Sequence, residues 1–247
     1  MIASLWRTLA RLRQALLPGQ CGVCHGWPAQ PVCADCRHAF ASVCTRCPRC
    51  ALPLDEASGT CPDCNERPPR LDHCIAAVDY AYPWNDLILR YKFQGSPGDA
   101  PWLAEMMREA PGARQLLGRA DWVVPVPLSS RRLTQRGFNQ AWELARVLAP
   151  ARVRHDLLAR RRDTQAQSRL NREDRLLNLQ RALAVPQARV AAVAGRHVLL
   201  VDDVMTTGAT LDAASQALRA AGARRVSALV FARAAKSGHA ERRPRPP

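Results

Sequence analysis

One stretch near the C-terminal end of the chain, residues 196–210, limits most strongly what this sequence can fold into. Its four apolar residues, 198–201, have the pattern of a short buried strand. The acids Asp202 and Asp203 end that run, and a Thr-Thr-Gly-Ala-Thr turn follows. The next segment, 211–221, is rich in Ala and Leu and is typical of a helix. The stretch therefore predicts a strand that passes through a tight turn into a helix.

The turn has the chemistry of an anion site. Free backbone N–H groups, the hydroxyls of Thr206, Thr207 and Thr210, and the positive end of the helix dipole all favour a phosphate there. Gly208 allows the backbone to approach an oxyanion closely. The two aspartates would repel a phosphate, so they suit sugar hydroxyls or a divalent cation such as Mg²⁺. A phosphorylated sugar supplies both a phosphate for the turn and hydroxyls for the aspartates. The simpler alternative is a pair of solvated aspartates beside a helix cap.

The whole string, four hydrophobic residues, two acids and Thr-Thr-Gly-x-Thr, resembles the 5-phosphoribosyl-1-pyrophosphate (PRPP) motif of type I phosphoribosyltransferases. This resemblance implies an α/β fold with a parallel-sheet core and flanking helices, and Mg²⁺ bound together with PRPP. It implies that Asp202 and Asp203 contact the ribose hydroxyls. The residues implied to cradle the 5-phosphate are Thr206, Thr207, Gly208, Ala209 and Thr210.

Four CxxC pairs lie between residues 21 and 64 of a chain with ten cysteines. Each pair offers two thiolates from one turn, so two pairs make one tetrahedral Cys₄ zinc site. We expect two structural zinc ions, with sequential pairing as the default and crossed pairing left open. Cys44 could compete as a ligand, His25 is a weaker candidate, and Cys74 is expected to be a buried small residue. The expected ligands are Cys21, Cys24, Cys33, Cys36, Cys47, Cys50, Cys61 and Cys64.

A second strand, near residues 121–127, leads into another candidate anion loop. Its prolines carry no N–H, so the donors available to an anion are those of Leu128, Ser129 and Ser130, with Arg131 nearby. In the type I enzymes a loop at this place holds the pyrophosphate; an ordinary strand exit is the alternative. Lys92, one of two lysines in the chain, lies beside aromatic residues and could face an anion or extend along the surface as the last residue of a helix.

Residues 157–178 are polar and basic, with little strand character. A solvated basic surface is the plain interpretation. At this place in the order, the type I enzymes carry a flexible catalytic loop that closes over PRPP and offsets charge on the departing pyrophosphate. By that resemblance the catalytic residues are Arg160, Arg162, Thr164 and Gln167.

Other segments predict further elements and a division into regions. We expect strands at 74–82 and 226–231, helices at 85–93, 102–117 and 141–148, and a linker at 186–195. The predicted regions are an amphipathic helix at 1–18, a Cys-rich double zinc ribbon at 19–68, a phosphoribosyltransferase domain at 69–235 and a disordered basic tail at 236–247.

Several motifs together narrow the resemblance to the ComF family. They are the CxxC array, Tyr-Lys-Phe-x-Gly (91–95), Val-Pro-Val-Pro-Leu (124–128), Arg-Gly-Phe-Asn-Gln (136–140), Arg-x-x-x-Thr-x-x-Gln (160–167) and the PRPP motif. The resemblance spans roughly residues 18–233 and implies a role in DNA uptake during natural transformation. Ala166, Leu183 and the extra Cys44 depart from the family pattern, but none of them lies in the phosphate loop.

The net charge, the N-terminal segment and Thr206 limit which functions the chain can have. A net charge of +15 fits polyanionic partners: PRPP, single-stranded DNA or the DNA-uptake machinery. The amphipathic segment 1–17 is too short and too charged to span a membrane, so we expect a cytoplasmic protein, and the oligomeric state stays open. Thr206 stands where purine-salvage members place a proton-accepting carboxylate. The chain is therefore expected to transfer phosphoribosyl to an acceptor such as an amine, or to act without catalysis as a PRPP sensor or DNA-handling competence factor.

Overall fold

The computed structural model describes residues 19–27, 31–41, 43–54, 59–93, 97–160 and 182–235. The chain forms two compact units, residues 1–42 with 242–247, and residues 43–241. The described part of the smaller unit contains α2 (Ala34–Phe40), whose first turn is capped by the Cys33 side chain. The predicted region boundaries at 18, 68 and 235 stay predictions.

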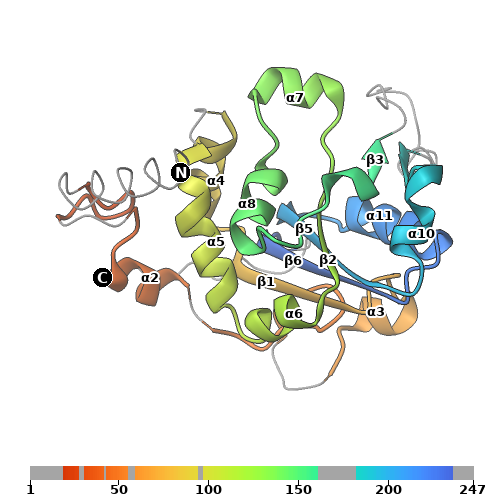
Figure 1. Ribbon diagram of the computed structural model, residues 1–247. Coiled ribbons are helices and arrows are strands. Elements are labelled where there is room, and N and C mark those ends of the chain that lie inside the picture. Colours follow the sequence, from red (N-terminus) through yellow and green to blue (C-terminus); the bar gives the residue numbers. More distant parts are fainter. Residues whose placement is uncertain are drawn as a thin grey trace, which may run out of the picture. The chain divides into compact units, whose positions relative to one another are not determined.

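The larger unit is built on a parallel sheet of four strands in the order β1-β6-β5-β2 (Figure 1). The two inner strands are nine residues long and almost wholly buried, as expected for a parallel sheet covered on both faces. The parallel core that the motif resemblance implied is thus confirmed. The strands are β1 (His73–Asp79), β2 (Trp122–Pro125), β5 (His197–Met205) and β6 (Arg225–Arg233).

Helices flank this sheet, and a short antiparallel pair lies outside it. The helices are α3 (Pro62–Glu66), α4 (Trp84–Phe93), α5 (Ala100–Glu109), α6 (Ala113–Arg119), α7 (Ser130–Arg136), α8 (Gln140–Leu148), α10 (Val190–Val193) and α11 (Ala209–Ala220). Single 3₁₀ turns are present at Pro97–Asp99, His155–Leu157 and Gln187–Arg189. The antiparallel pair is β3 (Ala159–Arg160) with β4 (Leu183–Ala184).

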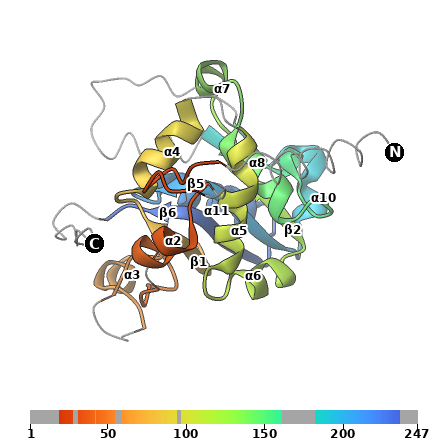
Figure 2. The ribbon, with the colours of Figure 1, turned by 90° about the vertical axis from the view of Figure 1, so that its left-hand side faces the viewer.

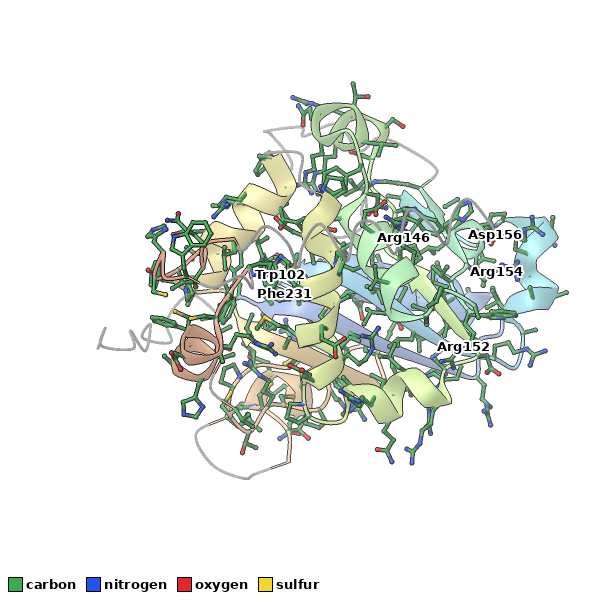
Figure 3. All side chains as sticks on the ribbon, turned by 60° about the vertical axis from the view of Figure 1, so that its left-hand side comes forward. Trp102, Arg146, Arg152, Arg154, Asp156 and Phe231 are labelled. Carbon is green, nitrogen blue, oxygen red and sulfur yellow. The ribbon has the colours of Figure 1, made fainter. Side chains whose placement is uncertain are left out.

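The two faces of the sheet bury different partners because side chains alternate along a strand. On one face, Phe231 of β6 makes edge-to-face contacts with Trp84 from α4 and Trp102 from α5, with ring centroids 6.1 and 6.2 Å apart. Figure 2 shows α4 and α5 on this face, and Figure 3 labels Trp102 and Phe231. On the other face, Val198 and Leu200 of β5 belong to a core that includes the apolar side of α11. The N-terminus of α11 thereby lies directly after β5, at the carboxyl edge of the sheet.

The structure corrects four of the predicted elements. The helix expected at 102–117 is two helices, α5 and α6, because Pro111 lacks an N–H and Gly112 takes a left-handed φ of 78°. The linker expected at 186–195 contains a 3₁₀ turn and α10. Strand β5 continues through the acidic pair to Met205. The strand expected at 74–82 ends at Asp79. A loop follows β2 as expected, and it leads into α7, a helix that was not predicted.

Among the residues that the structure describes, no helix combines the length and the apolar character that a bilayer crossing requires.

Candidate PRPP and metal sites

The predicted ligand residues of the larger unit gather where the parallel strands end. Ligands of open α/β sheets bind at this carboxyl edge, because the loops that follow neighbouring strands meet there. Asp202 and Asp203 lie near the C-terminal end of β5, and the candidate phosphate loop leads from Met205 into α11. β2 lies next to β5, so the loop after Pro125 faces the same edge.

The candidate phosphate loop, residues 206–210, is shaped by its glycine. Gly208 has a φ of 82° and caps α11, and a β-carbon there would lie 2.5 Å from Cε of Met205. Only glycine avoids both the strained φ and this contact. The Thr207 hydroxyl accepts the Ala209 N–H at 3.3 Å, and the Thr206 and Thr207 side chains are exposed. The loop thus presents two threonine side chains to solvent at a helix N-terminus, as a phosphate site requires.

The acidic pair is partly neutralised by a lysine from another helix. Lys92 Nζ, near the end of α4, lies 3.0 Å from an Asp203 carboxylate oxygen, and both side chains are largely buried. Asp202 accepts the Asp203 backbone N–H at 2.9 Å. Burial and the Asp203 charge raise the pKa of Asp202 to about 7, against the opposing charges of Lys92 and Arg136. The anion that faces Lys92 is therefore a carboxylate of the protein itself.

Asp202→Asn is expected to stabilise the free protein at pH 8. The folded-state pKa of Asp202, about 7, is above its ordinary value of 3.8, so folding binds a proton between these values and the carboxylate destabilises the folded state above pH 7. Each 1 kcal/mol gained raises the melting temperature of a chain this size by about 2–4 °C. The gain over wild type should shrink as the pH falls from 8 toward 4. Thermal melts at pH 8, 6 and 4 measure it, with exposed Asp86→Asn as the control; equal gains by both variants would contradict the burial argument.

The candidate pyrophosphate loop continues the sheet and then turns into α7. The Val126 N–H donates to the Val201 carbonyl at 3.0 Å, so the backbone after β2 stays beside β5. Ser129 caps α7: its hydroxyl accepts the Arg132 N–H at 3.3 Å. Leu128 and Ser129 are half-buried, and Arg131 is exposed on the first turn of α7. These three predicted residues thus lie on one loop at the carboxyl edge.

Two further motifs contact each other and support the lysine. Tyr91, buried beside Lys92, donates its hydroxyl to the Gln140 carbonyl at 3.2 Å and meets Phe138 edge-on at 5.5 Å. The Arg136 guanidinium lies 5.4 Å from the Phe93 ring centre and donates to the Gln140 side chain at 3.0 Å. Apart from Lys92, neither motif was predicted to contribute a site residue, because only the fold brings α4 against the start of α8.

The predicted catalytic loop lies largely outside the described residues. Arg162, Thr164 and Gln167 fall in the range 161–181, which the structure does not describe. Arg160 is described and corrects the expectation of little strand character: it belongs to β3 and pairs with Leu183 of β4. The described ends of the segment are thus joined as an antiparallel pair, as the two strands of a hairpin are.

The cysteines form two groups of four, paired sequentially as expected. Tetrahedral Zn–S bonds of about 2.3 Å place sulfurs roughly 3.8 Å apart. The sulfurs of Cys24 and Cys33 lie 3.7 Å apart, and those of Cys50 and Cys61 lie 3.6 Å apart, so both groups fit a zinc ion. Cys44 and His25 belong to neither group. The groups are Cys21, Cys24, Cys33 and Cys36, and Cys47, Cys50, Cys61 and Cys64.

The second group is part of the core of the larger unit. Its four cysteines are buried in the same apolar cluster as Val198 and α11, and Cys74 of β1 is buried beside them, as expected. The Cys74 N–H donates to the Pro48 carbonyl at 2.7 Å, and Arg46 forms an ion pair with Asp79 at 2.6 Å. Backbone N–H groups, including that of Cys61, outweigh burial and lower the pKa of the Cys47 thiol to about 7, whereas burial raises the pKa of Cys50 and Cys64.

Part of the chain matches a known domain family. The phosphoribosyl transferase domain model matches residues 133–245, from α7 through the candidate phosphate loop and β6. Together with the parallel sheet and its flanking helices, this match defines a phosphoribosyltransferase fold. A solved structure of the allosteric regulatory enzyme of purine biosynthesis is 21% identical, covering 54% of this chain and 25% of that one, with a TM-score of 0.36. That TM-score is too low to add to the assignment.

Full-length relatives then identify the family. The DNA utilization protein YhgH of Escherichia coli K12 is 33% identical over 84% of this chain and 93% of its own length. Competence protein F of Haemophilus influenzae is 31% identical over 82% and 90%. Competence protein ComFC of Bacillus subtilis is 29% identical over 77% and 79%. The chain belongs to the ComF family of phosphoribosyltransferase-fold proteins.

Proposed function

We propose that this protein binds PRPP with Mg²⁺ at the carboxyl edge of its sheet and transfers the phosphoribosyl group to an acceptor. The observation that carries the proposal is the placement of two carboxylates, Asp202 and Asp203, directly before a glycine-capped helix N-terminus. Carboxylates suit the ribose hydroxyls, and the helix N-terminus suits the 5-phosphate. The loop at Leu128 and Ser129 would receive the pyrophosphate, with Arg131 nearby. Mg²⁺ would arrive with the pyrophosphate oxygens, a donor set that it prefers.

The residues of the site also bear on the acceptor. In the transfer, the bond from ribose C1 to pyrophosphate breaks, the pyrophosphate leaves with the electron pair, and the acceptor forms a new bond to C1. Arg160 and Arg162 would offset the charge on the leaving group. Thr206 cannot take a proton from a ring nitrogen at neutral pH, because a hydroxyl is far too weak a base. The acceptor class is therefore a nucleophile that needs no protein base, such as an amine.

Calorimetric titration with PRPP and Mg²⁺, combined with an assay for released pyrophosphate, tests this function. The assay is run alone, with an amine and with single-stranded DNA as acceptors. Binding with acceptor-dependent release supports a transferase. Binding without release favours the second candidate, a non-catalytic competence factor that senses PRPP or handles single-stranded DNA. No binding overturns both the transfer and the sensing of PRPP, and leaves DNA handling as the function to test.

The relatives give that second candidate its specific support. Their printed names concern DNA utilization and competence, and the net charge of +15 suits a polyanion. We infer a role linked to DNA uptake in natural transformation, carried out in the cytoplasm. A readout of transformation frequency in a strain that carries the Asp202→Asn, Asp203→Asn variant separates a role that needs PRPP from one that does not.

Metal analysis of the purified chain is expected to find two zinc ions. Each four-cysteine group is closed, with no open coordination position, so zinc would have a structural and not a catalytic role. Mass-spectrometric metal counting of the wild type, and of Cys21→Ser with Cys24→Ser as a one-site reference, measures the number. A value near one in the wild type would mean that one group serves another purpose.

A further inference from the structure

A buried arginine connects the candidate phosphate loop to the second four-cysteine group. Arg233 is the last residue of β6, and only 1% of it is exposed. Among the described residues, no carboxylate lies within ion-pair distance of its guanidinium, so the charge is met by backbone carbonyls alone. A buried charge must be matched in this way to be tolerated. The carbonyls that accept from Arg233 are those of Cys50 at 2.7 Å, Met205 at 3.1 Å, Thr206, and Ala234 at 2.6 Å.

Two of these carbonyls set the direction of the N–H groups in the phosphate loop. In a planar trans peptide, the carbonyl and the next N–H point in opposite directions. Arg233 holds the Thr206 carbonyl toward itself, and it shares the Met205 carbonyl with the Ala234 N–H, which donates at 3.0 Å. The N–H groups of Thr206 and Thr207 must then point away from the guanidinium. The same interaction that neutralises a buried charge therefore orients two donors of the loop.

The third carbonyl belongs to a candidate metal ligand. Cys50 Sγ lies in the second group, 3.6 Å from Cys61 Sγ, and its carbonyl accepts from Nε of Arg233. A metal that closes this group would fix the Cys47–Cys50 turn, and with it the position of that carbonyl. A rigid planar guanidinium transmits the position because its donors have fixed relative directions. An ammonium at residue 233 would keep the charge but lose this fixed geometry.

We propose that Arg233 is a positioning residue for the 5-phosphate, and that metal binding at the second four-cysteine group and ligand binding at the phosphate loop are coupled through it. The inference rests on the proposed PRPP site. Arg233 acts through the backbone of the loop and touches no substrate. It should therefore affect ligands that carry a 5-phosphate and leave the loop at Leu128 and Ser129 unaffected.

Arg233→Lys is expected to weaken binding of ribose 5-phosphate about tenfold, the size of one charged hydrogen bond, and to leave Mg-pyrophosphate binding unchanged. A general loss of structure would weaken the binding of both ligands. The matched control is Arg152→Lys, since Arg152 also donates to two backbone carbonyls, of Ala120 at 2.8 Å and Gly118 at 3.4 Å, away from this edge (Figure 3). If Arg233→Lys unfolds, the titrations are repeated in trimethylamine N-oxide, which favours the compact state.

A second measurement follows the metal and not the ligand. In the Cys21→Ser, Cys24→Ser background, only the second group supplies zinc to a chromogenic chelator. Coupling is reciprocal, so saturating ribose 5-phosphate should slow zinc release, and Arg233→Lys should abolish the slowing. The inference would be overturned if ribose 5-phosphate slowed zinc release equally in the protein with Arg233 and in Arg233→Lys. It would also be overturned if Arg233→Lys lost affinity for ribose 5-phosphate and for Mg-pyrophosphate to the same extent. A wild type that binds neither ribose 5-phosphate nor PRPP would overturn the proposed function instead.

Discussion

Asp202→Asn combined with Asp203→Asn is expected to lower the affinity for PRPP with Mg²⁺ by about 100-fold or more. A hydrogen bond to a charged group contributes about 1.5–3 kcal/mol, and the double change removes both carboxylates that would accept from the ribose hydroxyls. Two such losses amount to about 3 kcal/mol or more, and 1.4 kcal/mol corresponds to a factor of ten. Isothermal titration calorimetry of the folded variant measures the change.

The control for this variant keeps the same net charge. Asp86 and Glu66 are exposed acids of the larger unit outside the site, so Asp86→Asn with Glu66→Gln should bind PRPP as the wild type does. The site variant should also fold with its metal content unchanged, because neither aspartate is a ligand of a four-cysteine group. Unchanged PRPP affinity in the site variant would disprove the assignment of the acidic pair. Equal losses in both variants would point to bulk charge as the cause.

Cys61→Ser with Cys64→Ser is expected to unfold the larger unit, whereas Cys21→Ser with Cys24→Ser should leave its melting temperature unchanged. The second group is buried in the sheet core, with each cysteine at most 7% exposed. A structural zinc site contributes about 10–16 kcal/mol in small domains, which matches or exceeds the net stability of about 5–15 kcal/mol of a whole domain. Loss of a zinc ion from this group is therefore expected to lower the free energy of unfolding enough to unfold the unit.

Near-ultraviolet circular dichroism follows this prediction, because Trp84 and Trp102 pack against Phe231 in the core of the larger unit. The Cys21, Cys24 variant is the matched control, since it removes two ligands of the same type from the other group. A folded Cys61, Cys64 variant with a wild-type melting temperature would show that packing alone holds the second group. In that case the proposed coupling of metal binding to ligand binding through Arg233 would also be contradicted.

Local patterns were sufficient where the chemistry is contiguous in the chain. The four apolar residues before Asp202 predicted the central strand, although that strand proved longer than the apolar run because Asp202 and Asp203 keep extended backbone to Met205. CxxC spacing predicted both four-cysteine groups and their sequential pairing. The prediction of a single helix at 102–117 was wrong, because the backbone constraints of Pro111 and Gly112 outweigh the apolar periodicity.

Long-range pairs could not be predicted in the same way. Lys92 and Asp203 are 111 positions apart, and the sequence left Lys92 between a surface lysine and one that faces an anion. The fold decides the question by bringing the end of α4 to the end of β5. Arg136 and Gln140 were noted only as parts of a motif, because their contacts with Phe93 and Tyr91 depend on how α4 packs against the start of α8.

The sequence by itself determined the class of site: an acidic pair before a glycine-containing turn, and eight thiolates at metal-binding spacing. These features are local, since a turn or a knuckle is specified by residues that are neighbours in the chain. Only the tertiary structure decided that Cys47–Cys64 belongs with the sheet and that Arg233 joins Cys50 to Met205 and Thr206. The reason is physical: a buried arginine is matched by carbonyls from two distant segments as well as from its own neighbour, and no spacing along the chain records which segments meet.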